Sequence, residues 1–326
     1  MDLIDKRIIA ELASNCRLSY RHLGKMLDIS ATTVQRRVAK LRDIGLFSRP
    51  YVILSLAMLE AEYCWVDVET DASEKDETII TEFGVNPNVM AVARMGPRRF
   101  FIIAEVSGAA GLYELGKFFR GFPCVQDIMI QFIQPLSATP SVHLPFTQKY
   151  VYLGRKIDLT KHHLAILEHL IHDAKMPATE IAKLTPYSSR RAQKIIQELQ
   201  TSGAFYFITF LRFSAASIVP FWLNIVFDEN KVAPHEVVEW VQGKIPMEYW
   251  NAFLFSQEPR VLHFCTTKDI QTLAAITNTL KDAPFAKRVE TYVLQPQSHF
   301  VGRGYIRLAE MLGMKVKNHV VEYYTD

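Results

Sequence analysis

The chain has 326 residues, of which 49% are hydrophobic, and a formal net charge of +3. That length supplies enough apolar material for more than one packed core. No apolar run reaches the roughly 18 residues of a membrane helix, and the first residues show no signal-peptide pattern, so we expect a cytoplasmic protein with no membrane partner. The four cysteines lack C-x-x-C spacing, which predicts buried, reduced thiols.

The first part of the chain is repeated. Residues 2 to 47 align with residues 160 to 205 at a constant offset of 158 and without a gap. Ile8 falls on Ile166, and Gly45, where a left-handed residue should end a helix, falls on Gly203. The sequence therefore predicts an internal duplication.

Each copy is predicted to form three short helices. In the first copy Ile4, Ile8 and Leu12 recur every four residues and give the first helix one apolar stripe. Ser19 and Ser30 are good N-caps for the second and third helices, which only a tight turn separates. This spacing predicts a helix-turn-helix.

The third helix of each copy carries side chains that can donate hydrogen bonds or hold positive charge. In the first copy we expect base or adjacent phosphate contacts from Thr32, Thr33, Gln35 and Arg36, phosphate contact or helix support from Arg37 and Lys40, and a place for Ser30 in the same interface. The candidates in the second copy are Ser189, Arg190, Arg191, Gln193 and Lys194.

The alternative is that these cations are only the solvated face of a small helical bundle. The distribution of charge favours nucleic acid instead. Residues 1 to 50 carry a net charge of +5 and residues 155 to 205 carry +3, whereas residues 51 to 154 carry −5 and residues 206 to 326 carry 0. The excess positive charge lies in the two helix-turn-helix copies, where phosphate would be met.

A sheet domain is predicted after each copy. The order βαββαβ is read from residues 63–68, 75–83, 89–94, 100–106, 112–119 and 125–133, and again from 221–227, 235–241, 249–255, 260–266, 270–280 and 288–294. Trp65 matches Trp222 in this second alignment. The expected fold class is α+β, with tandem (winged) helix-turn-helix and ferredoxin-like βαββαβ domains in duplicate.

Six segments follow from these patterns. The predicted domains are a first helix-turn-helix (1–50), a first sheet domain (51–136), a linker (137–154), a second helix-turn-helix (155–205), a second sheet domain (206–297) and a C-terminal extension (298–326). The extension is expected to contain a helix over 306–312 and a strand over 316–324, and to seal a sheet edge in preference to building a further oligomer contact. Gly302-Arg303-Gly304 lacks the pattern of a dinucleotide loop and is interpreted as a turn.

The first copy resembles the DNA-binding half of the Lrp/AsnC (leucine-responsive, feast/famine) family of transcription regulators. The resemblance rests on Ile4-Asp5, Ile8, Arg17-Leu18-Ser19-Tyr20, Leu23, Ile29-Ser30, Thr33-Val34, Arg37-Val38, Leu41 and Gly45. The βαββαβ domain is similar to that family's ligand-sensing and dimerising domain. Family members usually have one such unit, so this chain resembles a homodimer fused into one polypeptide.

Two departures from the family pattern matter for function. Ligand-responsive members have a glycine followed by an acidic residue in the turn between the second and third strands, but this chain has Gly96-Pro97-Arg98-Arg99 in one copy and Gln257-Glu258-Pro259-Arg260 in the other. The effector, if there is one, stays unknown. In addition, the third helices differ at core positions, so the two copies should not prefer the same bases.

These observations predict a sequence-specific transcription regulator and not an enzyme. The expected partners are double-stranded DNA and a second copy of the tandem chain, with a small-molecule effector left open and no cofactor or metal. His162, His169 and His172 share one helix side but have no further ligand in view, so a solvated face is favoured over metal. The alternatives are a siroheme-decarboxylase-like enzyme of the same architecture and an interaction scaffold that does not bind DNA.

Overall fold

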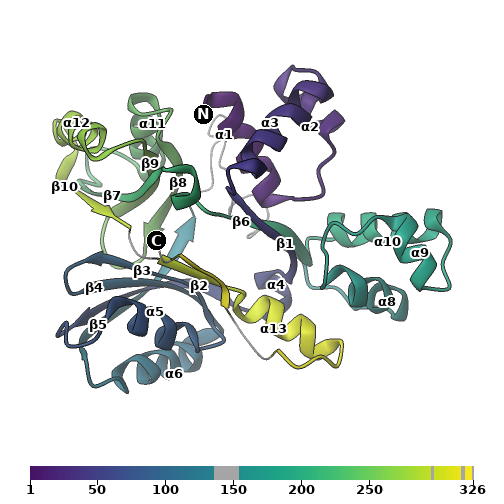
Figure 1. Ribbon diagram of the computed structural model, residues 1–326. Helices are drawn as coiled ribbons and strands as arrows, with labels where there is room; N and C mark the ends of the chain where they lie inside the picture. The colour runs from purple at the N-terminus through teal and green to yellow at the C-terminus, as the bar shows by residue number, and fades with distance from the viewer. Residues whose placement is uncertain (136–153, 295–296, 317–319, 325–326) are drawn as a thin grey trace. The chain divides into compact units, whose positions relative to one another are not determined.

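The computed structural model describes residues 1–135, 154–294, 297–316 and 320–324 (Figure 1). The predicted linker, residues 137–154, lies outside this part except for Gly154. The chain forms two compact units, each assembled from separate segments. The first unit comprises Met1–Ala61, Pro145–Arg212 and Arg303–Asn318, and the second comprises Glu62–Leu144, Phe213–Gly302 and His319–Asp326. Both helix-turn-helix copies belong to the first unit, and the six-segment division of the chain stays a prediction.

The first helix-turn-helix, called head 1, consists of α1 (Leu3–Ser14), α2 (Tyr20–Leu27) and α3 (Ala31–Asp43). The side chains of Ser19 and Ser30 accept the backbone N–H groups of His22 and Thr33, as the capping pattern predicted. Gly45 follows α3 with a φ of 75°, a conformation that glycine adopts without strain. Head 1 thus has the helices and helix boundaries that the sequence predicted.

Head 2 repeats this arrangement with α8 (Lys161–Leu170), α9 (Ala178–Leu184) and α10 (Ser189–Thr201). Thr160 caps α8, Ser188 caps α10, and Gly203 has a φ of 74°, so the repeat extends to the capping residues. The core of head 2 is completed from outside its own helices. Buried side chains of β1, β6 and α13, among them Val52, Phe207 and Leu308, pack into it.

A two-stranded ribbon joins the heads and was not predicted. β1 (Phe47–Leu54) pairs antiparallel with β6 (Phe205–Leu211), so the strand that leaves head 1 lies beside the strand that leaves head 2 (Figure 1). A short helix, α4 (Leu56–Leu59), follows β1. Since the paired strands come from equivalent positions in the two copies, the ribbon supports an approximate twofold relation between the copies.

The interpretation of Gly302-Arg303-Gly304 as a turn is wrong. These residues begin α13 (Gly302–Met311), which packs on the ribbon. A Cβ atom at residue 304 would lie 2.8 Å from the carbonyl oxygen of Leu54, so glycine lets the helix approach the strand closely. Gly304 therefore serves helix packing.

The second unit contains both βαββαβ domains in the predicted order. The first domain consists of β2 (Glu62–Thr70), α5 (Asp76–Gly84), β3 (Val89–Gly96), β4 (Arg99–Val106), α6 (Gly108–Arg120) and β5 (Val125–Pro135). The second, preceded by the short helix η1 (Ser214–Ala216), consists of β7 (Val219–Phe227), α11 (Pro234–Lys244), β8 (Tyr249–Phe255), β9 (Arg260–Thr267), α12 (Ile270–Lys281) and β10 (Ala286–Val293). Each domain has its own apolar core between helices and sheet.

The two sheet domains pair with each other inside one chain. Their strands join, through β5 and β8, into one sheet of order β10-β7-β9-β8-β5-β2-β4-β3-β11-β12. Trp65 and Trp222, which are equivalent in the repeat, meet edge to face with 5.3 Å between ring centroids, and Phe101 stacks on Trp65 at 4.5 Å. The contact between sheets that a homodimer would make is thus made here within the polypeptide.

The C-terminal segment covers a sheet edge, but the strand next to that edge is β11, which was not predicted. β11 (Gln297–Phe300) pairs with the outer strand β3, and β12 (Val320–Tyr324) pairs with β11. All four cysteines, Cys16, Cys64, Cys124 and Cys265, are buried and free. In the described part of the chain no helix is both long and apolar enough to cross a membrane.

Candidate nucleic-acid interface

The outer face of α3 is polar and accessible. Val34, Val38 and Leu41 are buried against α1 and α2, which turns the rest of the helix outward. Exposed predicted residues on or next to this face are Ser30, Thr32, Gln35, Arg36 and Lys40, while Thr33 and Arg37 are partly exposed. The amphipathic spacing of α3 therefore positions most of the predicted contact residues on one accessible surface.

Two of the predicted residues are engaged in building the helix. The backbone N–H of Thr33 donates to Ser30 Oγ at 3.0 Å, and the two hydroxyl oxygens lie 2.8 Å apart. This cap fixes the start of α3 and satisfies one of the amide donors there. The side chains of Thr32, Gln35 and Arg36 lie just beyond it, at the helix end that enters the major groove in helix-turn-helix proteins.

Arg37 holds head 1 together. Its Nη1 atom lies 2.8 Å from Asp2 Oδ2 and 2.7 Å from Asp5 Oδ1, so it joins α3 to the start of α1. Hydrogen bonds to Asp5 and Asp2 raise the pKa of the guanidinium. The pKa of Asp2 is lowered, first by the hydrogen bond from the backbone of Asp5 and further by Arg37. Of the two roles predicted for Arg37, this geometry matches helix support.

The recognition helix of head 2 has the same exposure but different chemistry. Its predicted residues are all exposed, namely Ser189, Arg190, Arg191, Gln193 and Lys194. The position of Arg37 is taken by Ile195, which is fully buried. The position of Lys40 is taken by Glu198, which lies 4.0 Å from Lys194 and 3.8 Å from the His163 ring. Positive charge in head 2 is therefore concentrated at the first turn of α10.

A cross-link between the heads was missed at the sequence level. Arg17 of head 1 donates from Nη1 to the carbonyl oxygens of Ala174 at 2.7 Å and Met176 at 3.1 Å in head 2. Burial lowers the pKa of Arg17, and the two carbonyl oxygens compensate the guanidinium. Nothing in the sequence signalled this contact, because its partners are backbone atoms 157 and 159 residues away.

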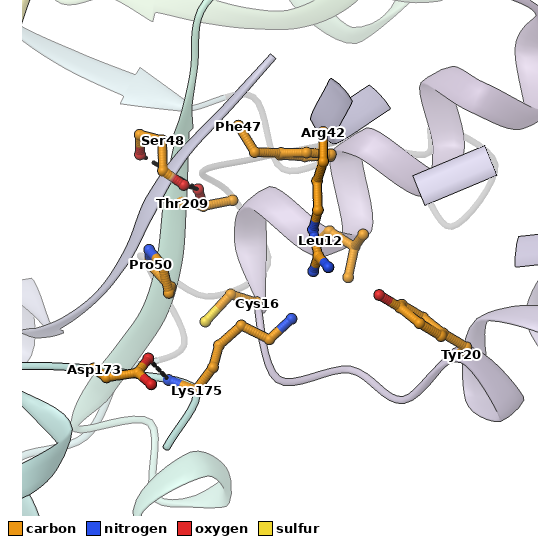
Figure 2. A pocket seen from close by; sticks show the side chains of 10 residues that line it. All are labelled: Leu12, Cys16, Tyr20, Arg42, Phe47, Ser48, Pro50, Asp173, Lys175 and Thr209. Carbon is orange, nitrogen blue, oxygen red and sulfur yellow. Dashed lines mark hydrogen bonds between the residues drawn. The ribbon is translucent and has the colours of Figure 1, made fainter. Parts of the chain in front are cut away.

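Beside this cross-link lies a pocket with a volume of about 430 Å³ (Figure 2). It is lined from head 1, from the α8–α9 connection of head 2 and from the ribbon, by Leu12, Cys16, Tyr20, Arg42, Phe47, Ser48, Pro50, Asp173, Lys175 and Thr209. None of these residues was predicted as functional. The basic residues Arg42 and Lys175 were counted in the charge of the two copies, but their convergence depends on the packing of one head near the other.

The two turns that depart from the family pattern end at Arg99 and Arg260, the first residues of β4 and β9. Arg99 Nη2 lies 3.6 Å from Asp67 Oδ1, and the Arg260 guanidinium lies 3.7 Å from the centroid of the Phe255 ring. Burial lowers the pKa of Arg260 and raises that of Asp67. Arg99 thus lies near a carboxylate, whereas Arg260 lies over an aromatic ring, and the effector stays an open prediction.

The three histidines considered as metal ligands do not converge. His162 Nδ1 lies 2.8 Å from the hydroxyl of Tyr187, and His163, its neighbour, caps α8. Among the described residues no group of three or more His, Cys, Asp or Glu side chains is placed to hold a metal ion.

Together these features define a class of protein, which has two helix-turn-helix heads on a shared ribbon and, as a separate unit, a pair of ferredoxin-like domains. Residues 1–42 match the AsnC-type helix-turn-helix domain, and the chain has Lrp/AsnC-family homologues. An uncharacterized HTH-type transcriptional regulator of Pyrococcus furiosus is 29% identical over 106 residues, which are 32% of this chain and 71% of that protein. Another, of Pyrococcus abyssi, is 23% identical over 144 residues, 44% of this chain and 90% of that protein.

The tandem arrangement also occurs in a solved structure. The siroheme decarboxylase NirDL superposes with a TM-score of 0.55 over 95% of this chain and 98% of its own, at 13% sequence identity. The prediction that the chain is not an enzyme is overturned by this match, since an enzyme has the same fold along nearly its whole length. The prediction relied on the basic, hydroxyl-rich face of the third helix, and such a face does not exclude an enzyme of the same fold.

Proposed function

We propose that the protein is a transcription regulator that binds specific sites in double-stranded DNA through α3 and α10. The observation that carries the proposal is the accessible, basic face of both α3 and α10, which in α3 is also rich in hydroxyl groups. The two helices belong to heads that share one compact unit. A helix of this kind fits the major groove of B-DNA. The AsnC-type match over residues 1–42 and the Pyrococcus homologues support the same assignment.

Each proposed contact has a role that its geometry supports. In α3, Thr32, Gln35 and Arg36 extend from the first turns toward base edges or the nearest phosphates, and Lys40 contacts phosphate further along the helix. Ser30 and Thr33 present the capped helix start to a phosphate, and Arg37 holds α3 against α1. In α10, Ser189, Arg190, Arg191, Gln193 and Lys194 form the corresponding surface.

The test is a titration of labelled duplex DNA, selected from random sequence, at several salt concentrations. Since cations that meet phosphate release condensed counterions, affinity should fall steeply as salt rises. Arg36→Ala should weaken binding, while Arg98→Ala removes an equally exposed arginine from the β3–β4 turn of the second unit and serves as the matched control. Binding that does not depend on salt, or equal effects of the two variants, would contradict the proposal.

We also propose that two chains assemble into a homodimer with four heads. The sheet faces already pair within the chain, so the second chain would be held by other surfaces. Light scattering at micromolar concentration should give twice the chain mass of 37.3 kDa. A mass of one chain would restrict the assembly to two heads.

A second candidate is a siroheme-decarboxylase-like enzyme, supported by the whole-chain match to NirDL. NirDL has also been solved with an iron-uroporphyrin III analogue. Titration of the purified protein with siroheme, followed by absorbance spectroscopy and analysis of the product, separates the two candidates. A saturable spectral change with loss of carboxylate from siroheme would establish the enzyme, whereas the regulator predicts no turnover.

A further inference from the structure

The pocket between the heads brings two cations together at one opening. Figure 2 shows Arg42 descending from α3, Lys175 rising from the α8–α9 connection and the hydroxyl of Tyr20 facing the same space. The amino group of Lys175 and the guanidinium of Arg42 have no carboxylate within ion-pair distance in the described part of the chain. Two like charges therefore share a partly enclosed space, and among the described residues neither is held in an ion pair.

The lone carboxylate of the pocket, Asp173, offsets only part of this positive charge. Asp173 Oδ1 accepts the backbone N–H of Lys175 at 2.8 Å and is thus engaged in the turn between α8 and α9. Burial lowers the pKa of Lys175, and the nearby charge of Arg42 lowers it further. The partly buried guanidinium of Arg17, close by, adds a third positive charge. An anion placed between Arg42 and Lys175 would relieve this repulsion.

The other walls of the pocket are apolar or already hydrogen-bonded. Leu12, Phe47 and Pro50 line one part of it. The hydroxyls of Ser48 and Thr209 are bonded to each other and to backbone carbonyl oxygens. The remaining space is therefore suited to a carbon skeleton, and the volume of about 430 Å³ lies in the range of small-molecule sites.

Covalent chemistry and metal binding do not fit this arrangement. Burial raises the pKa of the Cys16 thiol to about 12, so the sulfur is neutral at physiological pH and is not a nucleophile. One carboxylate among several cations is a poor set of ligands for a divalent metal. Reversible binding of an anion is what these residues favour.

We propose that this pocket binds a small organic carboxylate, with its charged group between Arg42 and Lys175 near the Tyr20 hydroxyl and its apolar remainder against Leu12, Phe47 and Pro50. The pocket wall comes from both heads and from the ribbon, so such a ligand contacts all three parts of the first unit. Bound carboxylate would fix α3 relative to head 2. The resulting change in DNA affinity, unlike ligand binding itself, rests on the proposed function.

Isothermal titration calorimetry on the full chain without DNA tests the binding. The probes are 3-phenylpropionate and 4-methylpentanoate, each compared with its neutral amide, which keeps the apolar part and removes the charge. We expect saturable binding of at least one carboxylate and affinity for its amide that is roughly tenfold weaker. No binding of either carboxylate, or equal binding of acid and amide, would overturn the proposal. Inorganic phosphate is the third probe. If phosphate binds as tightly as the carboxylates, the proposed contact between the apolar part of the ligand and Leu12, Phe47 and Pro50 is overturned.

Two variants localise the binding. Lys175→Met and Arg42→Gln should each weaken the carboxylate roughly tenfold and leave the amide unchanged. The controls Lys161→Met and Arg7→Gln change exposed residues of α8 and α1 that do not line the pocket. If the pocket variants bind the carboxylate like the wild type, the site lies elsewhere and the proposal fails. Thermal unfolding of each variant without ligand shows that the fold is retained.

A DNA titration with saturating carboxylate then tests the coupling separately. We expect DNA affinity to change severalfold in the wild type and not in Lys175→Met. If the carboxylate binds in the calorimeter but does not change the DNA affinity, the coupling between the pocket and DNA binding is overturned while the carboxylate site stands. If the protein binds no DNA in either condition, the proposed regulator function fails while the carboxylate site stands on the calorimetry.

Discussion

The two heads have the same helices and caps but are held together by different forces. In head 1, Arg37 of α3 pairs with Asp2 and Asp5 of α1, at the partly exposed edge of the head. In head 2 the equivalent of Arg37 is Ile195, which is fully buried in the core. One repeat position thus contributes an ion pair in one copy and apolar packing in the other.

The two copies also show which positions of the repeat maintain the fold of a head and which are available for DNA recognition. Val34 and Ala192 are both buried, and the capping serines Ser30 and Ser188 are kept. On the exposed face, by contrast, Thr32 is replaced by Arg190 and Lys40 by Glu198. The buried and capping residues are thus kept in both heads, whereas the exposed residues of α3 and α10 differ. The two heads should therefore recognise different bases.

The largest effect is expected from Ile195→Ala in head 2. Removing a fully buried isoleucine side chain leaves a cavity and should lower the free energy of unfolding by about 2 to 5 kcal/mol. Urea denaturation followed by circular dichroism measures this change, with Ile195→Val, expected to cost about 0.5 to 1.5 kcal/mol, as the graded control. If Ile195→Ala lowers the free energy of unfolding no more than Arg37→Ala does, apolar packing at this position of head 2 does not stabilise more than the ion pair in head 1.

The next effect concerns DNA affinity. Arg36→Ala in head 1 should weaken binding by about 1 to 3 kcal/mol and reduce the slope of affinity against salt, because one phosphate or base contact is lost. Arg37→Ala should change that slope less, since Arg37 is paired with two carboxylates. Fluorescence anisotropy on the same duplex compares the two variants. Equal loss of slope in both would show that Arg37 also contacts phosphate.

The smallest effect is expected from Arg37→Ala on stability. Ion pairs near the surface contribute about 1 kcal/mol or less, so the free energy of unfolding should fall by that amount near pH 7. The pKa of Asp2 is lowered from its ordinary value of 3.8, and its contribution is therefore present above that pH and lost as pH falls through the folded-state pKa. The gap between wild type and Arg37→Ala should narrow below about pH 4. A gap that stays constant with pH would contradict the role given to this pair.

The sequence predicted the heads and the sheet domains well because both depend on local patterns. Caps such as Ser19 and Ser30, the spacing of Ile8 and Leu12, and alternation along the strands are readable without knowledge of tertiary contacts. The β1–β6 ribbon was missed because its pairing joins strands more than 150 residues apart. The segment Gly302-Arg303-Gly304 was misread because the close packing of α13 on β1 at Gly304 is a tertiary property.

The candidate interface was predicted residue by residue from helical spacing, and the structure places most of those residues on the exposed faces of α3 and α10. The partners of Arg37 were not foreseen, because Asp2 and Asp5 come near it only when α1 packs on α3. The pocket was invisible for a similar reason. Lys175 and Arg42 come from different copies of the repeat, and no pattern within one copy relates them.

The central claim is tested most directly by selecting binding sites from random duplex DNA with the wild type and two variants. We predict enrichment of a site with two unequal halves, in which Arg36→Ala removes the preference at one half and the double variant Arg190→Ala, Arg191→Ala removes it at the other. A perfect palindrome that is lost in Arg36→Ala but unaffected by the double variant would show that only head 1 reads sequence. No enrichment of any site by the wild type would contradict the account.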